Sequence, residues 1–168
     1  MNIIVIGCGK IGSTLVASLT AEGHDVVALD RKAEVISDIT NIYDVMGVCG
    51  NGADSDILEE AGVANAEMVI AVTDSDELNM LACFLAKKMG AKNTIARIRN
   101  PEYTDQIYKM RELFALSMIV NPERQAAAEI ERLIKYPGFL KRESFAKGRL
   151  EIVELRLQAG SPLCNLSL

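Results

Sequence analysis

Six residues near the start of the chain have the spacing of a loop that binds phosphate. The run G-C-G-K-I-G (residues 7–12) directly follows the apolar residues 3–6 and precedes a stretch with helical periodicity. In this setting Gly7 permits the tight turn, Gly9 lets the backbone approach a pyrophosphate, and Gly12 lets the helix pack on its strand. The start of the helix supplies free N–H donors and a partial positive charge. The pattern predicts binding of a dinucleotide or another adenine nucleotide.

An acidic residue follows the second predicted strand at the place expected for a ribose contact. Asp30 ends residues 25–30, about 20 residues beyond the glycines, and its carboxylate can accept both ribose hydroxyls. The neighbouring Arg31 either contacts a 2′-phosphate, as in NADP binders, or stands in solvent in the first turn of the next helix. Because Asp30 would repel a 2′-phosphate, the pair favours the free 2′-OH of NAD or of ATP/ADP.

Lys10 and the loop after the third predicted strand are further candidates, each with a purely structural alternative. The Lys10 ammonium is placed to meet phosphate, although at the start of a helix it opposes the dipole and is equally suited to a solvated position. In residues 50–54 two glycines in three positions permit close backbone approach to an adenine ring. The same residues are typical of a turn. Asn51 and Gly52 join the candidate site on this basis.

The segments after the fourth and fifth predicted strands also carry polar side chains. Residues 73–77, T-D-S-D-E, offer hydroxyls and helix-start amides to ribose or phosphate, but helix capping by Asp74 or Ser75 explains them as well. Three nearby carboxylates also suit a divalent cation, for which capping is the favoured alternative, so we expect no metal site. Arg97 and Arg99 share one face of the fifth strand, and an arginine there needs a carboxylate or phosphate partner.

Apolar runs alternate with helical stretches along the first 120 residues. Six short strands are expected, at residues 2–6, 25–30, 45–49, 67–72, 93–99 and 117–120, with helices in the gaps. This pattern predicts a Rossmann-like, doubly wound α/β fold with a parallel sheet. In such a fold the ligand crevice lies outside the carboxyl ends of the strands, where the strand order reverses. All the candidate residues follow strands, so we expect them to meet there.

A further helix and a truncated second domain are expected beyond the sheet. The helix begins at residues 121–122 and carries an apolar stripe of Ala126, Ile130, Leu133 and Ile134. Because the sheet is complete, this stripe needs a neighbouring subunit or the chain's own domain to cover it. We assign residues 1–135 to a nucleotide-binding domain, 136–148 to a linker and 149–168 to the start of a small second domain.

The composition excludes several classes of protein. The 168-residue chain is 49% hydrophobic, which indicates a globular protein, and it has a net charge of −5 without a basic stripe, which argues against binding nucleic acid or anionic membranes. No apolar run approaches the ~18 residues of a membrane span, and no signal peptide is evident, so we expect a cytoplasmic protein with no direct membrane insertion.

The cysteines and the histidine offer no catalytic arrangement. Four cysteines without C-x-x-C spacing indicate small buried apolar side chains in a reducing compartment. The single histidine, His24, lies in a turn at the edge of the sheet opposite the crevice. A dehydrogenase of this fold needs a proton donor and a substrate clamp in a second module, so we expect a protein that is not an enzyme.

Five ordered motifs resemble the TrkA-type potassium-uptake regulators, whose nucleotide-binding domain is called KTN or RCK. They are the glycine loop and residues 27–30, 50–63, 71–79 and 95–101, and the resemblance runs from residue 1 to about residue 135. The tail from residue 149, with G-S-P-L at 160–163, looks like the opening of the family's small C-terminal ligand domain.

The resemblance implies a regulatory subunit, cytoplasmic and peripheral at the inner face of the cell membrane. It implies a homo-oligomer, with dimers building a ring beneath a potassium-translocating membrane subunit, that changes shape when NAD(H) or ATP/ADP binds. Relatives often carry two such halves in tandem, so a longer full-length protein fits the resemblance.

The resemblance also implies roles for individual residues. By position, it implies that the phosphates lie at Gly7, Gly9, Lys10 and Gly12, with Ile11 in the same loop, and that the ribose lies at Asp30. The adenosine end is expected at Arg31 and Asn51, beside Gly52, and the far side of the ligand at Thr73 and Asp74. Arg97 is expected to meet a phosphate or a neighbouring subunit. Lys10 departs from relatives that have Arg there, which puts its γ-phosphate contact in doubt.

Two rival functions stay open at this point. One is an NAD(P)-dependent oxidoreductase whose substrate domain is missing, and the other is a structural ring-forming protein that a nucleotide merely stabilises. The sequence does not choose between NADH, NAD and ATP, because Asp30 reports only a free 2′-OH.

Overall fold

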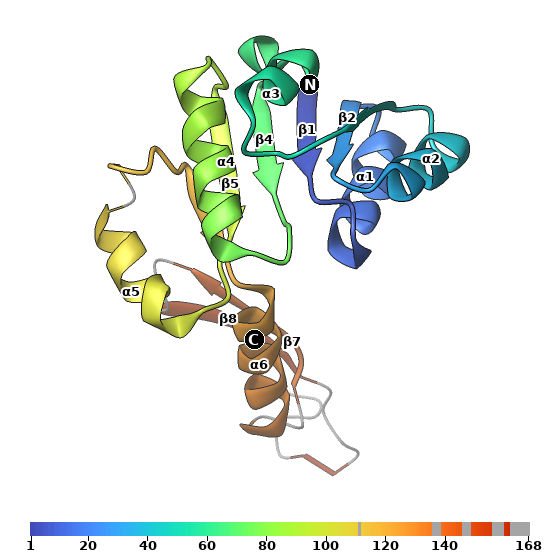
Figure 1. Cartoon of the computed structure of the whole chain (residues 1–168). Helices are drawn as coiled ribbons and strands as arrows, with labels where there is room; N and C mark the ends of the chain where they lie inside the picture. Colours follow the sequence, from blue (N-terminus) through green and yellow to red (C-terminus); the bar gives the residue numbers. More distant parts are fainter. Residues whose placement is uncertain (111, 136–138, 146–148, 156–159, 162–168) are drawn as a thin grey trace. The chain divides into compact units, whose positions relative to one another are not determined.

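The chain forms two compact units, Met1–Pro122 and Glu123–Leu168. The computed structural model describes residues 1–110, 112–135, 139–145, 149–155 and 160–161 (Figure 1).

The first unit is a six-stranded parallel sheet with the strand order β3-β2-β1-β4-β5-β6. Its strands are β1 (Asn2–Ile6), β2 (Asp25–Asp30), β3 (Met46–Cys49), β4 (Met68–Ala71), β5 (Asn93–Arg97) and β6 (Met118–Val120). Strand β1 pairs with β2 on one side and β4 on the other, so the strand order reverses there. The predicted Rossmann-like, doubly wound fold is confirmed, and every predicted strand is present with ends that differ by at most two residues.

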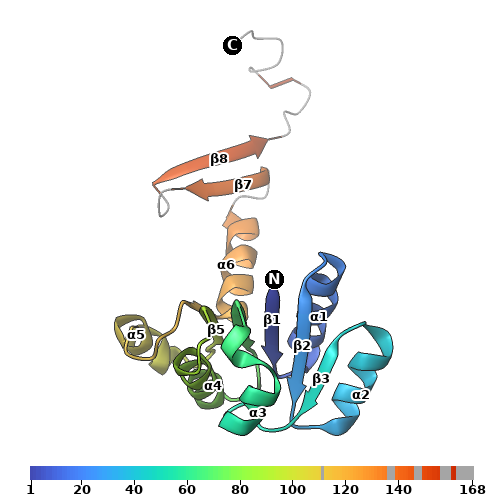
Figure 2. The same ribbon diagram turned by 90° about the horizontal axis from the view of Figure 1, so that it is seen from above.

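Helices cover both faces of this sheet (Figure 2). They are α1 (Lys10–Ala21), α2 (Ala33–Ile42), α3 (Ser55–Glu60), a 3-10 helix (Val63–Asn65), α4 (Asp76–Lys88) and α5 (Pro101–Met110). Side chains of α1 and α2 form one core with Ile3 and Val5, whereas those of α3, α4 and α5 form another with Ile4 and Ile6. Because successive residues of β1 face opposite cores, the four buried residues after Asn2 are all apolar, as in parallel strands covered on both faces.

Side chains cap the starts of two helices, α3 and α4. The Asp54 side chain accepts a hydrogen bond from the backbone N–H of Asp56 at the start of α3. The Ser75 hydroxyl accepts one from the N–H of Leu78 at the start of α4, at 3.1 Å. Of the two proposed caps for α4, Ser75 is therefore the residue that serves.

The second unit contains most of α6 (Pro122–Lys135) and a hairpin of β7 (Phe139–Phe145) and β8 (Leu150–Leu155). Strand β7 lies within the segment that we expected to be a linker. Its sequence, F-L-K-R-E-S-F, has three charged residues in succession and no alternation, so its conformation depends on pairing with β8. The domain boundaries stay a prediction, and residues 162–168, including Cys164, lie outside the described residues.

Candidate functional site

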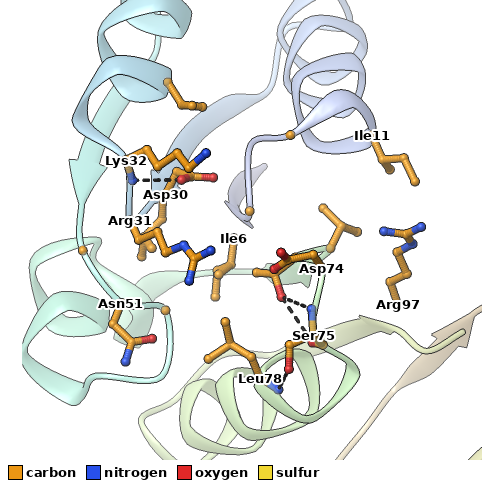
Figure 3. A pocket seen from close by; sticks show the side chains of 18 of the residues that line it. Ile6, Ile11, Asp30, Arg31, Lys32, Asn51, Asp74, Ser75, Leu78 and Arg97 are labelled. Atoms are coloured by element: carbon orange, nitrogen blue, oxygen red, sulfur yellow. Dashed lines mark hydrogen bonds between the residues drawn. The ribbon is translucent and has the colours of Figure 1, made fainter. Parts of the chain in front are cut away.

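A cleft of about 920 Å³ opens at the carboxyl ends of the strands, around the point where the strand order reverses. The loops after β1, β2, β3 and β4 and the last residue of β5 contribute to its lining (Figure 3). It lies at the upper end of the size range of ligand pockets. The predicted site residues that line it are Gly7, Gly9, Lys10, Ile11, Asp30, Arg31, Asn51, Gly52, Thr73, Asp74 and Arg97.

The glycine loop begins with a turn that only glycine adopts readily. Gly7 has a φ of +89°, and its N–H donates to the carbonyl of Leu29 at 2.8 Å. A Cβ atom at this position would lie 2.7 Å from the backbone nitrogen of Thr73. The missing side chain therefore allows the loop after β1 to lie directly against the loop after β4.

The other two glycines of the loop differ in what surrounds them. A Cβ on Gly9 would meet no atom within 4 Å, whereas one on Gly12 would lie 1.9 Å from the carbonyl oxygen of Gly7. Gly12 is the one predicted site residue that does not line the cleft, and it allows α1 to pack on the loop. Gly9 is the N-cap of α1 and makes no side-chain cap, so the first N–H groups of the helix are available to an anion.

Two backbone hydrogen bonds fix the orientation of the Asp30 carboxylate. Its Oδ2 accepts from the N–H of Cys8 at 2.8 Å, and its Oδ1 accepts from the N–H of Lys32 at 2.9 Å. Each carboxylate oxygen can accept more than one hydrogen bond, so both can still accept from a hydroxyl. Asp30 thus joins the glycine loop to the end of β2 and presents an oriented acceptor to the cleft.

The Cys8 thiol beneath this carboxylate is buried and neutral. Burial, and secondly the charge of Asp30, raise its pKa to about 12. Since a thiol is nucleophilic only as the thiolate, Cys8 is a small packing residue of the loop.

Cationic side chains outnumber carboxylates in the cleft lining. The charged residues there are Lys10, Arg31, Lys32, Arg97, Asp30 and Asp74. Figure 3 shows Arg31 and Arg97 on opposite sides. An excess of cations in the cleft of a chain whose net charge is −5 indicates an anionic ligand. Sequence reasoning missed Lys32, although it directly follows Arg31 in the same loop.

The loop after β3 is both a turn and part of the cleft lining, the two alternatives that the sequence left open. The Asn51 side chain accepts a hydrogen bond from the N–H of Ala53 at 3.1 Å, which is a local turn interaction. Asn51 and Gly52 also line the cleft, together with apolar residues. The apolar lining consists of Ile11, which the sequence predicted, and of five residues that the sequence analysis did not identify: Ile6, Leu29, Val35, Val72 and Leu78.

The acidic segment after β4 supports the structure through Asp76. Asp76 is buried, and its Oδ2 accepts from the N–H groups of Arg99 at 2.9 Å and Asn100 at 2.7 Å. Its Oδ1 lies 3.8 Å from Nε of Arg99. Arg99 therefore finds a carboxylate partner, while Arg97 lines the cleft. Within the ranges that the structure describes, no three His, Cys, Asp or Glu side chains form a group suited to a metal ion.

Glu77 connects the start of α4 to α5. Its carboxylate accepts hydrogen bonds from the Tyr103 hydroxyl and the Ser75 hydroxyl, both at 2.9 Å. A backbone hydrogen bond at Glu77, followed by these two, holds the pKa of Glu77 below its usual value. Glu77 is thus engaged outside the cleft.

Cys49, Cys83 and His24 do not line the cleft. His24 precedes β2 at the opposite edge of the sheet, as predicted, with its Nε2 3.6 Å from Oε2 of Glu22. Cys83 is buried in α4, but Cys49 is exposed, so the expectation that it is buried is wrong. It belongs to β3, an edge strand, where one side lacks a neighbouring strand. No helix in the described part of the chain has the length and apolar character to span a bilayer.

Comparison with known sequences identifies a matching domain family. The sequence model of the TrkA-N domain matches residues 3–122. The chain is 36% identical to the Trk system potassium uptake protein TrkA of Vibrio alginolyticus, over all of this chain and 37% of that protein. It is 31% identical to a TrkA homolog of Methanothermobacter thermautotrophicus, over 95% of this chain and 72% of that protein. The chain thus spans little more than a third of the Vibrio protein.

Comparison with solved structures gives the same fold. The TrkA-N domain of the inner membrane protein ybaL from Escherichia coli superposes with a TM-score of 0.71 at 20% identity, covering 79% of this chain and 96% of that one. The GsuK channel bound to NAD superposes with a TM-score of 0.61 at 22% identity, covering 71% of this chain and 21% of that one. The Shewanella denitrificans Kef C-terminal domain in its AMP-bound form gives 0.65 at 20% identity, over 80% and 81%.

Proposed function

Because the chain belongs to the TrkA-N domain family, we propose that it is a nucleotide-binding regulatory module of a potassium-uptake system. Its task is to control a potassium-translocating membrane subunit from the inner, cytoplasmic face of the membrane. The observation that carries the proposal is the oriented Asp30 carboxylate beside an open helix N-terminus in a cation-lined cleft. The relatives named as Trk potassium uptake proteins support the choice of system.

The proposed ligand is NAD(H) or ATP/ADP. The first N–H groups of α1 and Lys10 meet its phosphates, Asp30 accepts from the ribose, and Arg31 and Asn51 flank the adenosine end. On the other side of the cleft Thr73, Asp74 and Arg97 meet the distal part of the ligand. The open space at Gly9 and the cationic lining fit a pyrophosphate, and structural neighbours that bind NAD or AMP support this class of ligand.

The regulatory mechanism is a population shift. Residues that line the cleft come from five strand ends, so a ligand that contacts both Asp30 and Arg97 stabilises one arrangement of these loops over others. A membrane subunit that binds one arrangement more tightly than the other then responds to whether the cleft holds a ligand. Ligand-dependent Rb⁺ flux through the membrane subunit, reconstituted in vesicles with this chain, tests the control directly. Flux that is the same with and without nucleotide would contradict it.

Self-association through α6 is part of the proposal. Ile130, Leu133 and Ile134 on this helix are 57, 60 and 75% exposed, and burying them against a second copy would gain about 25 cal/mol per Å² of apolar surface. Glu129 and Arg132 pair beside this stripe at 2.9 Å and supply a polar rim. Replacing Ile130 and Leu133 by Asp should give monomers, as measured by sedimentation. The monomers should still bind nucleotide in titrations. Unchanged assembly in this double variant would rule out the interface.

Binding measurements on matched variants of β2 test the nucleotide site. Titrations should show that the wild-type chain binds NADH, NAD, ATP or ADP, and binds NADPH more weakly because Asp30 repels its 2′-phosphate. Asp30→Asn should lose about 1–3 kcal/mol of binding free energy, because it removes a charged acceptor. Asp25→Asn is the control, since Asp25 is an exposed carboxylate at the other end of the same strand. Equal affinities of both variants and the wild type would remove Asp30 from the site.

The same preparation tests the proposal that the module is not an enzyme. With NADH and a panel of small carbonyl compounds, no turnover is expected. Steady oxidation of NADH would favour the NAD(P)-dependent oxidoreductase instead.

A further inference from the structure

Asn79 is a buried polar residue near the start of α4 that does not line the cleft. Its exposed fraction is 0%, and it occupies the fourth position of a helix, where asparagine is a poor helix former. A buried amide without hydrogen-bond partners costs free energy. Both features indicate that the side chain serves a purpose other than helix formation.

Every hydrogen-bonding position of the Asn79 amide is used. Its Oδ1 accepts from the backbone N–H of Thr73 at 2.8 Å and from the Thr73 hydroxyl at 2.7 Å. Its Nδ2 donates to the carbonyl of Arg97 at 2.9 Å and to that of Thr73 at 3.3 Å. A flipped amide would face its NH₂ group toward the Thr73 N–H and its oxygen toward two carbonyls. The network therefore fixes both the identity and the orientation of this side chain.

The two residues that Asn79 joins are among the lining residues of one side of the cleft. Thr73 follows β4, Arg97 ends β5, and both line the cleft. The side that holds Asp30 is fixed by other hydrogen bonds, from Cys8 and Lys32 to Asp30 and from Gly7 to Leu29. None of these involves Asn79, so loss of the amide removes the support of one side only.

We infer that Asn79 is a positioning residue that sets the relative placement of Thr73 and Arg97, and thereby the affinity for the distal part of a long nucleotide. The inference rests on the proposed function. It separates ligands by length: AMP is held by the side with Asp30, whereas NADH must also reach Thr73 and Arg97. Asn79 therefore favours long nucleotides over short ones without touching either.

The test compares the dissociation constants of AMP and NADH in Asn79→Ala and in the wild type. NADH binding should weaken about tenfold, whereas AMP binding should change less than about twofold. The matched control is Thr94→Val, because Thr94 is also 0% exposed and its hydroxyl donates to the carbonyl of Ala115 at 2.8 Å. It lies toward the amino end of the same strand as Arg97. The control should lower the melting temperature without changing the ratio of the two affinities.

A second variant and a measurement on the wild type keep the test decisive. Asn79→Asp preserves the side-chain volume and the acceptor for Thr73 but loses both Nδ2 donors, so it should shift the ratio in the same direction. In the wild type without ligand, the amide of Thr73 should exchange with solvent far more slowly than that of Ala53, which donates to the exposed Asn51 side chain. Equal exchange rates would overturn the inference.

The outcomes separate this inference from the proposed function. A wild-type chain that binds neither AMP nor NADH would contradict the proposed function. If the wild type binds both and Asn79→Ala weakens both equally, the nucleotide site stands and Asn79 is only a structural residue.

Discussion

The two sides of the cleft are held together by different kinds of interaction. On the side of β1 and β2, glycines and backbone N–H groups hold the loops in place, because the N–H of Gly7 donates to the carbonyl of Leu29 and the Asp30 carboxylate accepts from two backbone amides. On the side of β4 and β5, the buried α4 side chains of Asn79 and Asp76 hold the backbone in place through hydrogen bonds. Figure 3 shows the lining residues of the two sides facing each other.

The difference shows which substitutions each side tolerates. Where a backbone turn forms the support, adding a side chain at Gly7 or Gly12 is harmful, because there is no space for a Cβ at these two positions. Where buried side chains form the support, removing a polar group is harmful, because it leaves buried N–H groups without partners. Four experiments test this contrast, from the largest expected effect to the smallest.

Gly12→Ala should cause the largest loss of stability, about 3 kcal/mol. The added methyl group would lie 1.9 Å from the backbone oxygen of Gly7, and a backbone turn cannot move as a flexible side chain can. Unfolding in urea measures the loss. Gly9→Ala is the control, since a Cβ there meets no atom within 4 Å. Equal stability of both variants would mean that α1 does not depend on close packing against the loop.

Gly9→Val should remove nucleotide binding while the fold is kept. The side chain enters the open space above the loop, where a phosphate would approach the backbone, so the affinity for NADH should fall by about 100-fold or more. Calorimetric titration measures the affinity, and a thermal melt verifies the fold. Normal binding by this variant would show that the glycine loop is only a structural turn.

Asp76→Ala should destabilise the other side of the cleft by about 2 kcal/mol. The substitution leaves the N–H groups of Arg99 and Asn100 without their carboxylate acceptor. Asp74→Ala is the matched control two residues away, because Asp74 is exposed and should change the stability by less than about 0.5 kcal/mol. If both variants unfold at the same urea concentration, the buried carboxylate does not support this side.

Both sides have a buried thiol beneath them, and neither should react. Burial raises the pKa of Cys8 and of Cys83 to about 12, so iodoacetamide at pH 8 should modify the exposed Cys49 before these two thiols, as measured on peptides by mass spectrometry. The unfolded chain loses these protons near pH 9, whereas the folded chain keeps them. The two thiols therefore contribute stability that is lost between about pH 9 and pH 12. Modification of Cys8 as fast as Cys49 would show that the glycine loop opens readily.

The sequence by itself determined the local elements of the first unit and most of the residues at the strand ends. The strands were predictable because an apolar run between turn residues is a local pattern, and Ser75 and Asp54 cap helices through neighbours two or three residues away. The glycine loop was predictable for the same reason, since Gly7 and Gly12 are close in the sequence and also lie against each other in the structure.

Only the tertiary structure decided which polar groups are buried together. The order of the strands places β4 beside β5, and this pairing brings Asp76 to the amides of Arg99 and Asn100, more than twenty residues along the chain. From the sequence Asp76 was a candidate cation ligand among three carboxylates. Likewise, β7 lacks an alternating pattern and becomes a strand through its partner β8. Interactions between distant residues depend on how the elements pack, and a local pattern does not contain that information.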